Sequence, residues 1–386
     1  MTDGPLARAA SSVPRRLSLP ALSTAHSHAF QRAMRGRGQR PKEKNADDFW
    51  TWRGQMYRTA SELTPESYAK IARVAFRELR AAGVRTVGEF HYIHHQADGT
   101  PYDDRTLMSD VVIEAARGAG LRIALLRCAY ARAGHDRAPE PGQRRFCDPT
   151  PDAVLADVDA LRKKYAGHAD VMIGLAPHSV RAVPPAWLPV LAEYARRADL
   201  PLHMHVAEQT REIEECLAET GRRPLELCND HGMLGPRFVA VHATHLLPHE
   251  AKLLGDATGF ACICPTTERD LGDGLADFEH LRSSGVRLCT GIDSHTITDP
   301  IEELRSLETH ERLRRRSRVT FAPDGSTPAE QLWKEGSQNG ALAVGFADAG
   351  GAIMIDLDHP QLALVEPGFE LDAIVFGASS AVVVSD

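Results

Sequence analysis

The sequence predicts an α/β fold in which eight parallel strands, each followed by a helix, close into a (β/α)₈ TIM barrel. Eight short segments are almost wholly apolar and are bounded by Gly, Pro or polar residues. This composition is typical of strands buried on both faces of a parallel sheet. Helical patterns fill the intervals, and the alternation favours a barrel. The strand candidates are Ala21–His28, Thr86–Tyr92, Arg122–Arg127, Val171–Ala176, Pro201–Val206, Phe238–His242, Gly259–Cys264 and Leu288–Asp293.

The helical segments carry the start and stop signals that helices need. Pro65–Ala82 follows Thr64, a good N-cap residue, and ends at Gly83. No G-x-G-x-x-G follows a predicted strand, which counts against a doubly wound nucleotide-binding sheet. The other predicted helices are Thr106–Gly118, Asp152–Tyr165, Pro184–Ala198, Thr210–Glu219 and Pro300–Arg315.

The chain divides into three parts by composition and hydrophobic pattern. Residues 1–20 show no clear period and are interpreted as a lead-in, the remnant of an N-terminal β segment. Residues 21–325 form the predicted barrel. From residue 326 to residue 386 Gly, Ala and Val dominate, with strand-like pieces at 352–357, 373–377 and 381–386. We therefore expect a small C-terminal β-appendage.

Composition and charge exclude several classes of protein. The net charge of -7 argues against a nucleic-acid binder, which usually has a basic face. No run approaches the eighteen apolar residues of a membrane span, and the N-terminus has no apolar signal region. The seven cysteines form no C-x-x-C pair, as expected for reduced thiols. We expect a cytoplasmic protein with neither a membrane nor a nucleic-acid partner.

Histidines gather where an active site would lie. In a barrel the carboxyl ends of the strands meet on one face, where catalytic residues collect. Packing alone would not place nine of the eighteen histidines at or just past these ends. They are His26, His28, His91, His178, His203, His205, His242, His245 and His295.

The spacing of these histidines predicts a metal site. His26 and His28 lie two residues apart, so both side chains point to one side of the first strand. The pair His203 and His205 closes the fifth strand, and either ring could face the metal. Asp293 adds a carboxylate at the end of the eighth strand. Three imidazoles and one carboxylate are typical of a mononuclear catalytic zinc site, and Fe²⁺ or Mn²⁺ accept the same ligand types.

Several segments together resemble the amidohydrolase superfamily. The pattern consists of H-x-H on strand one, His on strands five and six, and Asp on strand eight. Within the superfamily, the chain resembles the branch that hydrolyses N-formimino-L-glutamate to N-formyl-L-glutamate and ammonia in histidine breakdown. The resemblance covers roughly residues 20–320. Its clearest segments are HSHAFQRAMRG (26–36), FWTWRGQMYR (49–58), EFHYIHH (89–95), HSVRAV (178–183), HMHVAEQ (203–209), RRPLELC (222–228), VHATH (241–245), ERDLGDG (268–274) and GIDSH (291–295).

The resemblance implies a role for each residue of the centre. It assigns one zinc ion to His26, His28, His205 and Asp293, and leaves His203 beside the site. It also implies three catalytic residues. Asp293 would take a proton from the attacking water, Glu208 would carry a proton to the leaving nitrogen, and His242 would stabilise the charge of the tetrahedral adduct.

The resemblance further implies a small dicarboxylate substrate and a homodimer. Arginine suits carboxylate recognition because its planar fork can donate two parallel hydrogen bonds. For Arg53 and Arg181 a surface salt bridge is the alternative. The substrate-binding residues implied are Gln31, Arg53, Tyr92, His178 and Arg181.

Two departures from the family and two rival functions qualify this interpretation. Only 25 residues precede His26, and the family pattern after residue 335 is faint, so we expect the β-appendage formed by the chain termini to be incomplete. One rival function is deamination of a guanine-like or triazine-like ring by another member of the superfamily. The other is a catalytically impaired, truncated paralogue.

Overall fold

Eight parallel strands form the centre of the molecule, and they follow one another around the sheet in sequence order. The computed structural model describes residues 14–40, 48–323 and 325–384. All eight predicted strands are confirmed. They are β2 (Leu22–Ser27), β3 (Val84–His91), β4 (Arg122–Ala129), β5 (Val171–Pro177), β6 (Leu202–Val206), β7 (Phe238–His242), β8 (Phe260–Ile263) and β9 (Arg287–Thr290).

The sheet closes into a barrel between β2 and the segment that follows β9. A parallel bridge joins Ser27 to Asp293. The backbone N–H of His28 donates to the carbonyl of Asp293 at 2.9 Å, and the N–H of Asp293 donates to the carbonyl of His26 at 3.1 Å. These bonds place residues 26, 28 and 293 side by side, although more than 260 residues separate them in sequence.

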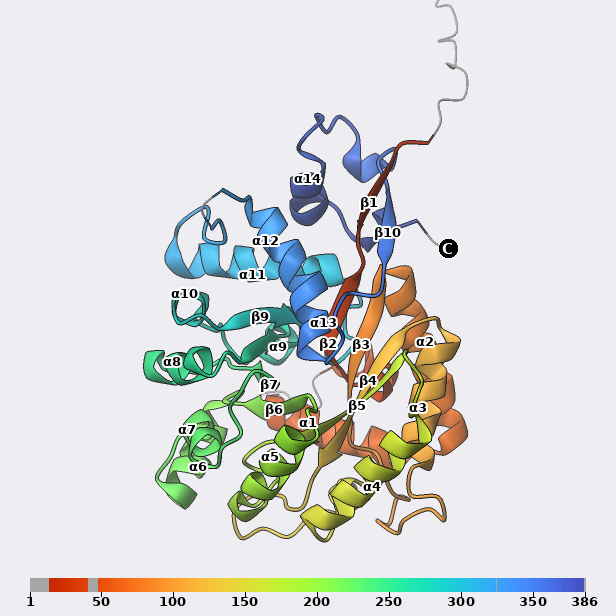
Figure 1. Cartoon of the computed structure of the whole chain (residues 1–386), viewed down its shortest axis with the longest axis vertical. Helices are drawn as coiled ribbons and strands as arrows, with labels where there is room; N and C mark the ends of the chain where they lie inside the picture. The colour runs from red at the N-terminus through yellow and green to blue at the C-terminus, as the bar shows by residue number, and fades with distance from the viewer. Residues whose placement is uncertain (1–13, 41–47, 324, 385–386) are drawn as a thin grey trace, which may run out of the picture.

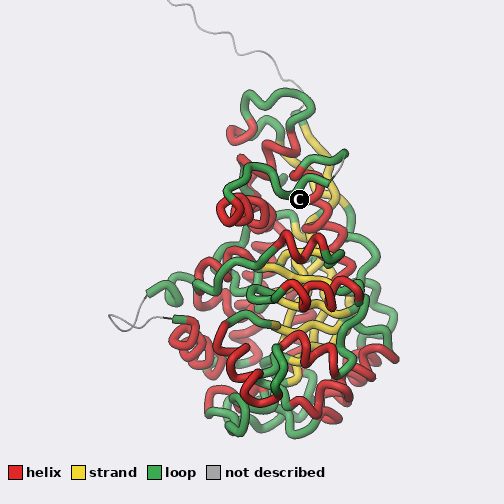
Figure 2. The backbone as a smooth tube through the Cα atoms, turned by 90° about the vertical axis from the view of Figure 1, so that its left-hand side faces the viewer, coloured by secondary structure: helices red, strands yellow, loops and turns green. Residues whose placement is uncertain are grey.

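Helices connect successive strands and surround the barrel, with the sheet in the middle of the molecule (Figures 1 and 2). All six predicted helices are confirmed. The segments 49–61, 224–230, 248–256, 265–271 and 278–283 are also helical, beyond those predictions. The helices of this part are α1 (Phe49–Ser61), α2 (Pro65–Ala81), α3 (Leu107–Gly118), α4 (Pro151–Lys164), α5 (Leu188–Arg197), α6 (Thr210–Thr220), α7 (Pro224–Asp230), α8 (Pro248–Asp256), α9 (Pro265–Leu271), α10 (Phe278–Ser283) and α11 (Pro300–Arg315).

The barrel end formed by the strand amino termini is closed by α12 (Pro328–Lys334), a π-helical turn (Glu335–Asn339) and α13 (Gly340–Ala343). The Asn339 amide donates to the carbonyl of Leu288, at the start of β9. Ala341, Ala343 and Val344 pack in one buried cluster with residues of β2, β4, β7 and β8. The opposite end, at the strand carboxyl termini, is the one left for a functional site.

This packing leaves no room for a side chain at Gly88 in β3. A methyl group there would lie 2.5 Å from the carbonyl oxygen of Ala25 and 2.5 Å from the Val344 side chain. We expect Gly88→Ala to lower the free energy of unfolding by about 1–3 kcal/mol, because overpacking forces the backbone to shift. Gly118→Ala is the matched control, since its methyl group would meet nothing within 4 Å. Chemical denaturation of both variants tests this, and equal stabilities would contradict it.

Segments near the two ends of the described chain form a two-stranded ribbon at the top of Figure 1. The helix α14 (Glu370–Gly377), also in the upper part of the view, packs against α11 and α12. Strand β1 (Arg16–Pro20) pairs antiparallel with β10 (Ala352–Asp356), as expected for the segment 352–357. The prediction of a strand at 373–377 is wrong, because this segment lies in α14 (Glu370–Gly377). A short apolar run does not distinguish a strand from a buried helix, and Ile374 and Val375 are buried from within a helix.

The remaining expectations for the termini are met only in part. Val383 makes a single bridge to Ile355, and a 3₁₀ turn covers Ser380–Val382 in place of a strand at 381–386. Residues 1–13 of the lead-in and residues 385–386 lie outside the described residues. Among the described helices, none is long and apolar enough to cross a membrane.

Candidate active site

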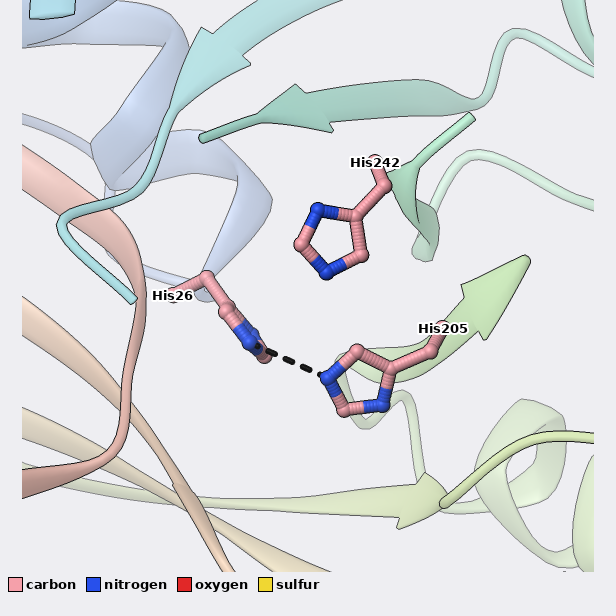
Figure 3. Close-up of side chains that lie close together, drawn as sticks. All are labelled: His26, His205 and His242. Carbon is pink, nitrogen blue, oxygen red and sulfur yellow. Dashed lines mark hydrogen bonds between the residues drawn. The ribbon is translucent and has the colours of Figure 1, made fainter. Parts of the chain in front are cut away.

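Three imidazoles and one carboxylate meet at the carboxyl end of the barrel. The Nε2 atom of His26 lies 3.1 Å from that of His28 and 3.2 Å from that of His205. Asp293 Oδ1 lies 3.4 Å from the Nε2 atoms of both His26 and His28. Figure 3 shows the rings of His26 and His205 pointing toward each other. Ligands at about 2.0–2.1 Å from a tetrahedral zinc ion stand about 3.3 Å apart, so this spacing fits a metal ion.

The outer nitrogens of two rings are held by backbone carbonyls. His28 Nδ1 donates to Phe90 O at 2.9 Å, and His205 Nδ1 donates to His178 O at 2.9 Å. A carbonyl can only accept, so each proton sits on Nδ1 and each Nε2 lone pair faces the centre. These bonds therefore prepare the two rings to bind a metal.

Burial keeps the imidazoles of the centre neutral. It lowers the pKa of His26 to about 3, with His28 and His242 adding to the effect against the attraction of Asp293. Burial also lowers the pKa of His28 and that of His205. For Asp293 burial raises the pKa, but the hydrogen bond to His26 and the positive charge of His242 outweigh burial and hold the pKa below its ordinary value. Neutral imidazole and ionised carboxylate are the forms that bind metals.

His242, from the end of β7, stands among three carboxylates. Its Nδ1 is 3.1 Å from Glu268 Oε1, and its Nε2 is 3.7 Å from Glu208 Oε1 and 3.8 Å from Asp293 Oδ2. Burial alone lowers the pKa of His242, but the charge of Glu208, the hydrogen bond to Glu268 and the charge of Asp293 raise it to about 10. The ring can therefore donate a proton or a hydrogen bond toward the centre.

Several backbones at the site adopt the left-handed conformation. The φ angles are 52° at Ala207, 66° at His242, 52° at Ala243 and 54° at Asp293. Such conformations cost free energy for residues other than glycine and persist where surrounding structure imposes them. They turn the chain sharply after β6, β7 and β9, and so aim the side chains into the barrel mouth.

Among the described residues, three groups of side chains could hold a metal ion, and all belong to this one site. They are His26 with His205 and His242, His26 with His28 and Asp293, and His242 with Cys264 and Glu268. His26 is common to the first two groups. The four ligands expected from the sequence thus lie together, and His242 lies close enough to compete with them.

A small cavity opens above these ligands. Ten of the eleven residues expected at the site line it, and the eleventh, His26, is fully buried next to His28 and His205. Helix α1 forms one wall. The cavity is lined by His28, Gln31, Phe49, Trp52, Arg53, Met56, Tyr57, Tyr92, His178, Arg181, His205, Glu208, His242, Leu271 and Asp293.

The expected substrate-binding residues are held by their neighbours. The Gln31 amide donates to the Tyr92 hydroxyl at 3.0 Å, and the Gln31 carbonyl oxygen is buried without a partner. Arg53 stacks over the Trp50 ring at 4.4 Å. The Arg181 side chain is only 6% exposed and forms an ion pair with Glu208, so it is not a surface salt bridge.

The histidines at the strand ends do not all face the centre. His203 points toward the closed end of the barrel, where its Nε2 donates to Ala343 O at 2.9 Å. His295 Nε2 lies 2.9 Å from the Ser27 hydroxyl. His26, His28, His178, His205 and His242 lie in or beside the cavity, whereas His91, His203, His245 and His295 are not among its lining residues.

The sequence interpretation missed three buried glutamates around the site. Glu89 accepts from the Ser27 hydroxyl at 2.6 Å and from the Ala29 N–H at 2.7 Å, and burial raises its pKa to about 8. Glu268 holds His242, and Glu212 contacts Arg181. A carboxylate inside an apolar strand, as at Glu89, is rarely buried without a partner. The position of Glu89 in the sequence therefore already indicated a buried, partnered carboxylate.

Sequence comparisons find deaminases among the proteins similar to this chain. Formimidoylglutamate deiminase from Pseudomonas aeruginosa is 39% identical over 362 residues, covering 90% of this chain and 78% of that protein. 8-oxoguanine deaminase from the same organism is 28% identical over 94% of this chain and 74% of that protein.

Solved structures show the same fold. An amidohydrolase from Brucella melitensis aligns with a TM-score of 0.86 at 34% identity, over 95% of this chain and 84% of that one. An adenosine deaminase from Xanthomonas campestris, solved with bound zinc, shares the fold at 20% identity and a TM-score of 0.78, over 95% of this chain and 77% of that one. The family model described as the amidohydrolase family matches residues 17–379, and the chain belongs to that family.

Proposed function

We propose that this protein is a metal-dependent deiminase that hydrolyses N-formimino-L-glutamate to N-formyl-L-glutamate and ammonia. The observation that carries the proposal is a buried guanidinium, Arg181, in the same cavity as the metal-ligand cluster. A carboxylate-reading group beside a hydrolytic centre suits an acyclic, anionic amidine. The 39% identity to a formimidoylglutamate deiminase supports the same substrate.

One metal ion, held by His26, His28, His205 and Asp293, is part of the proposal. Distances of 3.1–3.4 Å between the ligand atoms of His26 and His28, His26 and His205, and Asp293 and both His26 and His28 support this set. His242 is assigned to catalysis for two reasons. Glu268 holds its Nδ1, and its Nε2 lies 3.8 Å from Asp293, whereas the Nε2 atoms of His26 and His28 lie 3.4 Å from Asp293. We assign zinc on the ligand types, and elemental analysis distinguishes it from Fe²⁺ or Mn²⁺. The proposed assembly is a homodimer, which light scattering tests.

The reaction adds water across the C=N bond of the formimino group and then breaks the bond to the terminal nitrogen. A bound divalent metal supplies a Lewis acid that makes water a better nucleophile. Asp293 accepts a proton from the attacking water, and His242 donates a hydrogen bond to the charge that develops on the adduct. Glu208 passes the protons released by the water to the terminal nitrogen, so the C–N bond breaks with ammonia, not an amide ion, as the leaving group.

Ammonia release from N-formimino-L-glutamate by the metal-loaded protein tests the function. A ring deaminase of the same family would instead release ammonia from 8-oxoguanine or a related purine. Turnover of the purine with no turnover of formiminoglutamate contradicts the proposal. Failure with both substrates despite full metal occupancy would favour the catalytically impaired alternative.

Glu208→Gln tests the proton transfer. The amide keeps the size of the side chain and its contact with Arg181, but it cannot carry a proton. We expect kcat to fall by about 10²-fold or more, the usual contribution of a positioned acid–base group. Metal content and melting temperature should stay at wild-type values. Near-normal turnover in a fully metal-loaded variant would remove Glu208 from the mechanism.

A further inference from the structure

The positively charged guanidinium of Arg181 is buried, which is unusual for an arginine. It follows β5, and its guanidinium lies over the rings of Phe49 at 5.6 Å and Trp50 at 5.8 Å. A buried charge without a partner is strongly destabilising, so the fold has to supply opposite charges. It supplies two, Glu208 and Glu212.

The two carboxylates contact different edges of the guanidinium. Glu208 Oε2 lies 3.1 Å from Arg181 Nη2, and Glu208 itself lines the cavity. Glu212 Oε2 lies 3.1 Å from Arg181 Nε, and Glu212 is fully buried outside the cavity lining. The contact with Glu212 is an ion pair without a hydrogen bond. Because the guanidinium is a rigid plane, attraction at its Nε edge still favours one direction for the terminal nitrogens.

Glu212 is itself held firmly. It lies in the first turn of α6, and its Oε1 accepts from the backbone N–H of Ala207 at 2.9 Å. Burial alone lowers the pKa of Arg181, but the charge of Glu212, and after it that of Glu208, raises the pKa above its ordinary value. Both carboxylates therefore stabilise the charged form of Arg181.

We propose that Glu212 is a positioning residue that anchors Arg181 by its Nε edge and so determines the preference of the enzyme for a substrate carboxylate. Glu208 is needed for proton transfer and cannot serve as a permanent anchor. Glu212 does not contact the reacting atoms and acts through Arg181. This inference rests on the proposed function, since Arg181 must read a carboxylate of formiminoglutamate.

The test compares Glu212→Gln with Glu212→Asp. Gln keeps an oxygen that can accept from Ala207 N–H but loses the charge that holds Arg181, whereas Asp keeps the charge on a shorter side chain. We expect Gln to lower kcat/KM for formiminoglutamate by about 10-fold to 100-fold, typical of a group that orients another site residue. The loss should lie mainly in KM. Asp should recover part of it, and metal content should not change.

Glu250→Gln is the matched control. Glu250 is fully buried in the first turn of α8, lies 2.7 Å from Arg223 Nε and accepts from Leu247 N–H at 2.9 Å. As at Glu212, a buried glutamate in the first turn of a helix pairs with an arginine Nε and accepts from a backbone N–H, although at Glu250 the arginine contact is also a hydrogen bond. Neither Glu250 nor Arg223 lines the cavity. We expect its melting temperature to fall as much as that of Glu212→Gln, with kcat/KM almost unchanged.

Two measurements separate a role through Arg181 from a general loss of structure. With the mono-amide of formiminoglutamate that lacks the carboxylate read by Arg181, Glu212→Gln should change kcat/KM by less than about twofold. In an Arg181→Met background the effect of Glu212→Gln on the natural substrate should vanish, as for coupled residues in a double-mutant cycle. Equal losses on both substrates, or a loss that persists in that background, would overturn the inference. Failure of the wild-type protein to hydrolyse formiminoglutamate would instead refute the proposed function.

Discussion

His205→Ala should lose its metal ion and its activity, whereas His203→Ala should keep most of its metal. The two histidines lie two residues apart on β6 but at different depths. His205 Nε2 faces His26 at 3.2 Å, with its Nδ1 held by a backbone carbonyl. His203 Nε2 instead donates to Ala343 O near the closed end. Removing one of four ligands takes away Lewis-acid stabilisation worth several kcal/mol, so kcat/KM should fall by about 10³-fold or more.

Elemental analysis after desalting, combined with ammonia release, checks this pair. The His203 variant serves as the control for loss of a buried imidazole, and its expected defect is in stability. A buried carbonyl left without its donor costs about 1–3 kcal/mol. If both variants lose metal to the same extent, the assignment of His205 as the ligand on β6 is wrong.

Arg181→Met should lose most of the activity on formiminoglutamate and little on an analogue without the matching carboxylate. Removing one partner of a buried charge pair costs about 2–5 kcal/mol, or about 30-fold to several thousand-fold in kcat/KM. The analogue provides the internal control, because both substrates meet the same variant. Since Arg181→Met also leaves Glu212 buried without its partner, the melting temperature has to be measured alongside.

Arg53→Met offers a second comparison. Arg53 lies in α1, stacks on Trp50 and lines the same cavity as Arg181. We expect it to read the other carboxylate, so the two arginine variants should discriminate against different mono-amides. Equal losses on both substrates with Arg181→Met would mean that this residue supports the barrel mouth and does not read a carboxylate.

The sequence by itself determined the strands, their order and the types of residue that we propose as metal ligands. Segments such as 238–241 are apolar throughout because both faces of each strand are buried, and this property is local. The pairing of His26 with His28 follows from the two-residue period of a strand, which is also local. In the C-terminal segment the same reasoning failed at 373–377, because a short apolar run is compatible with strand and helix alike.

Only the tertiary structure decided which partner each charged group has. Glu212 and Arg181 are 31 positions apart, Glu268 and His242 are 26 apart, and no spacing rule connects them. The choice between His203 and His205 likewise depends on depth in the barrel, which α13 sets by closing one end. Local periodicity predicts to which face of its own strand a side chain points. What it meets there depends on chain closure across the whole barrel, which joins residues 27 and 293.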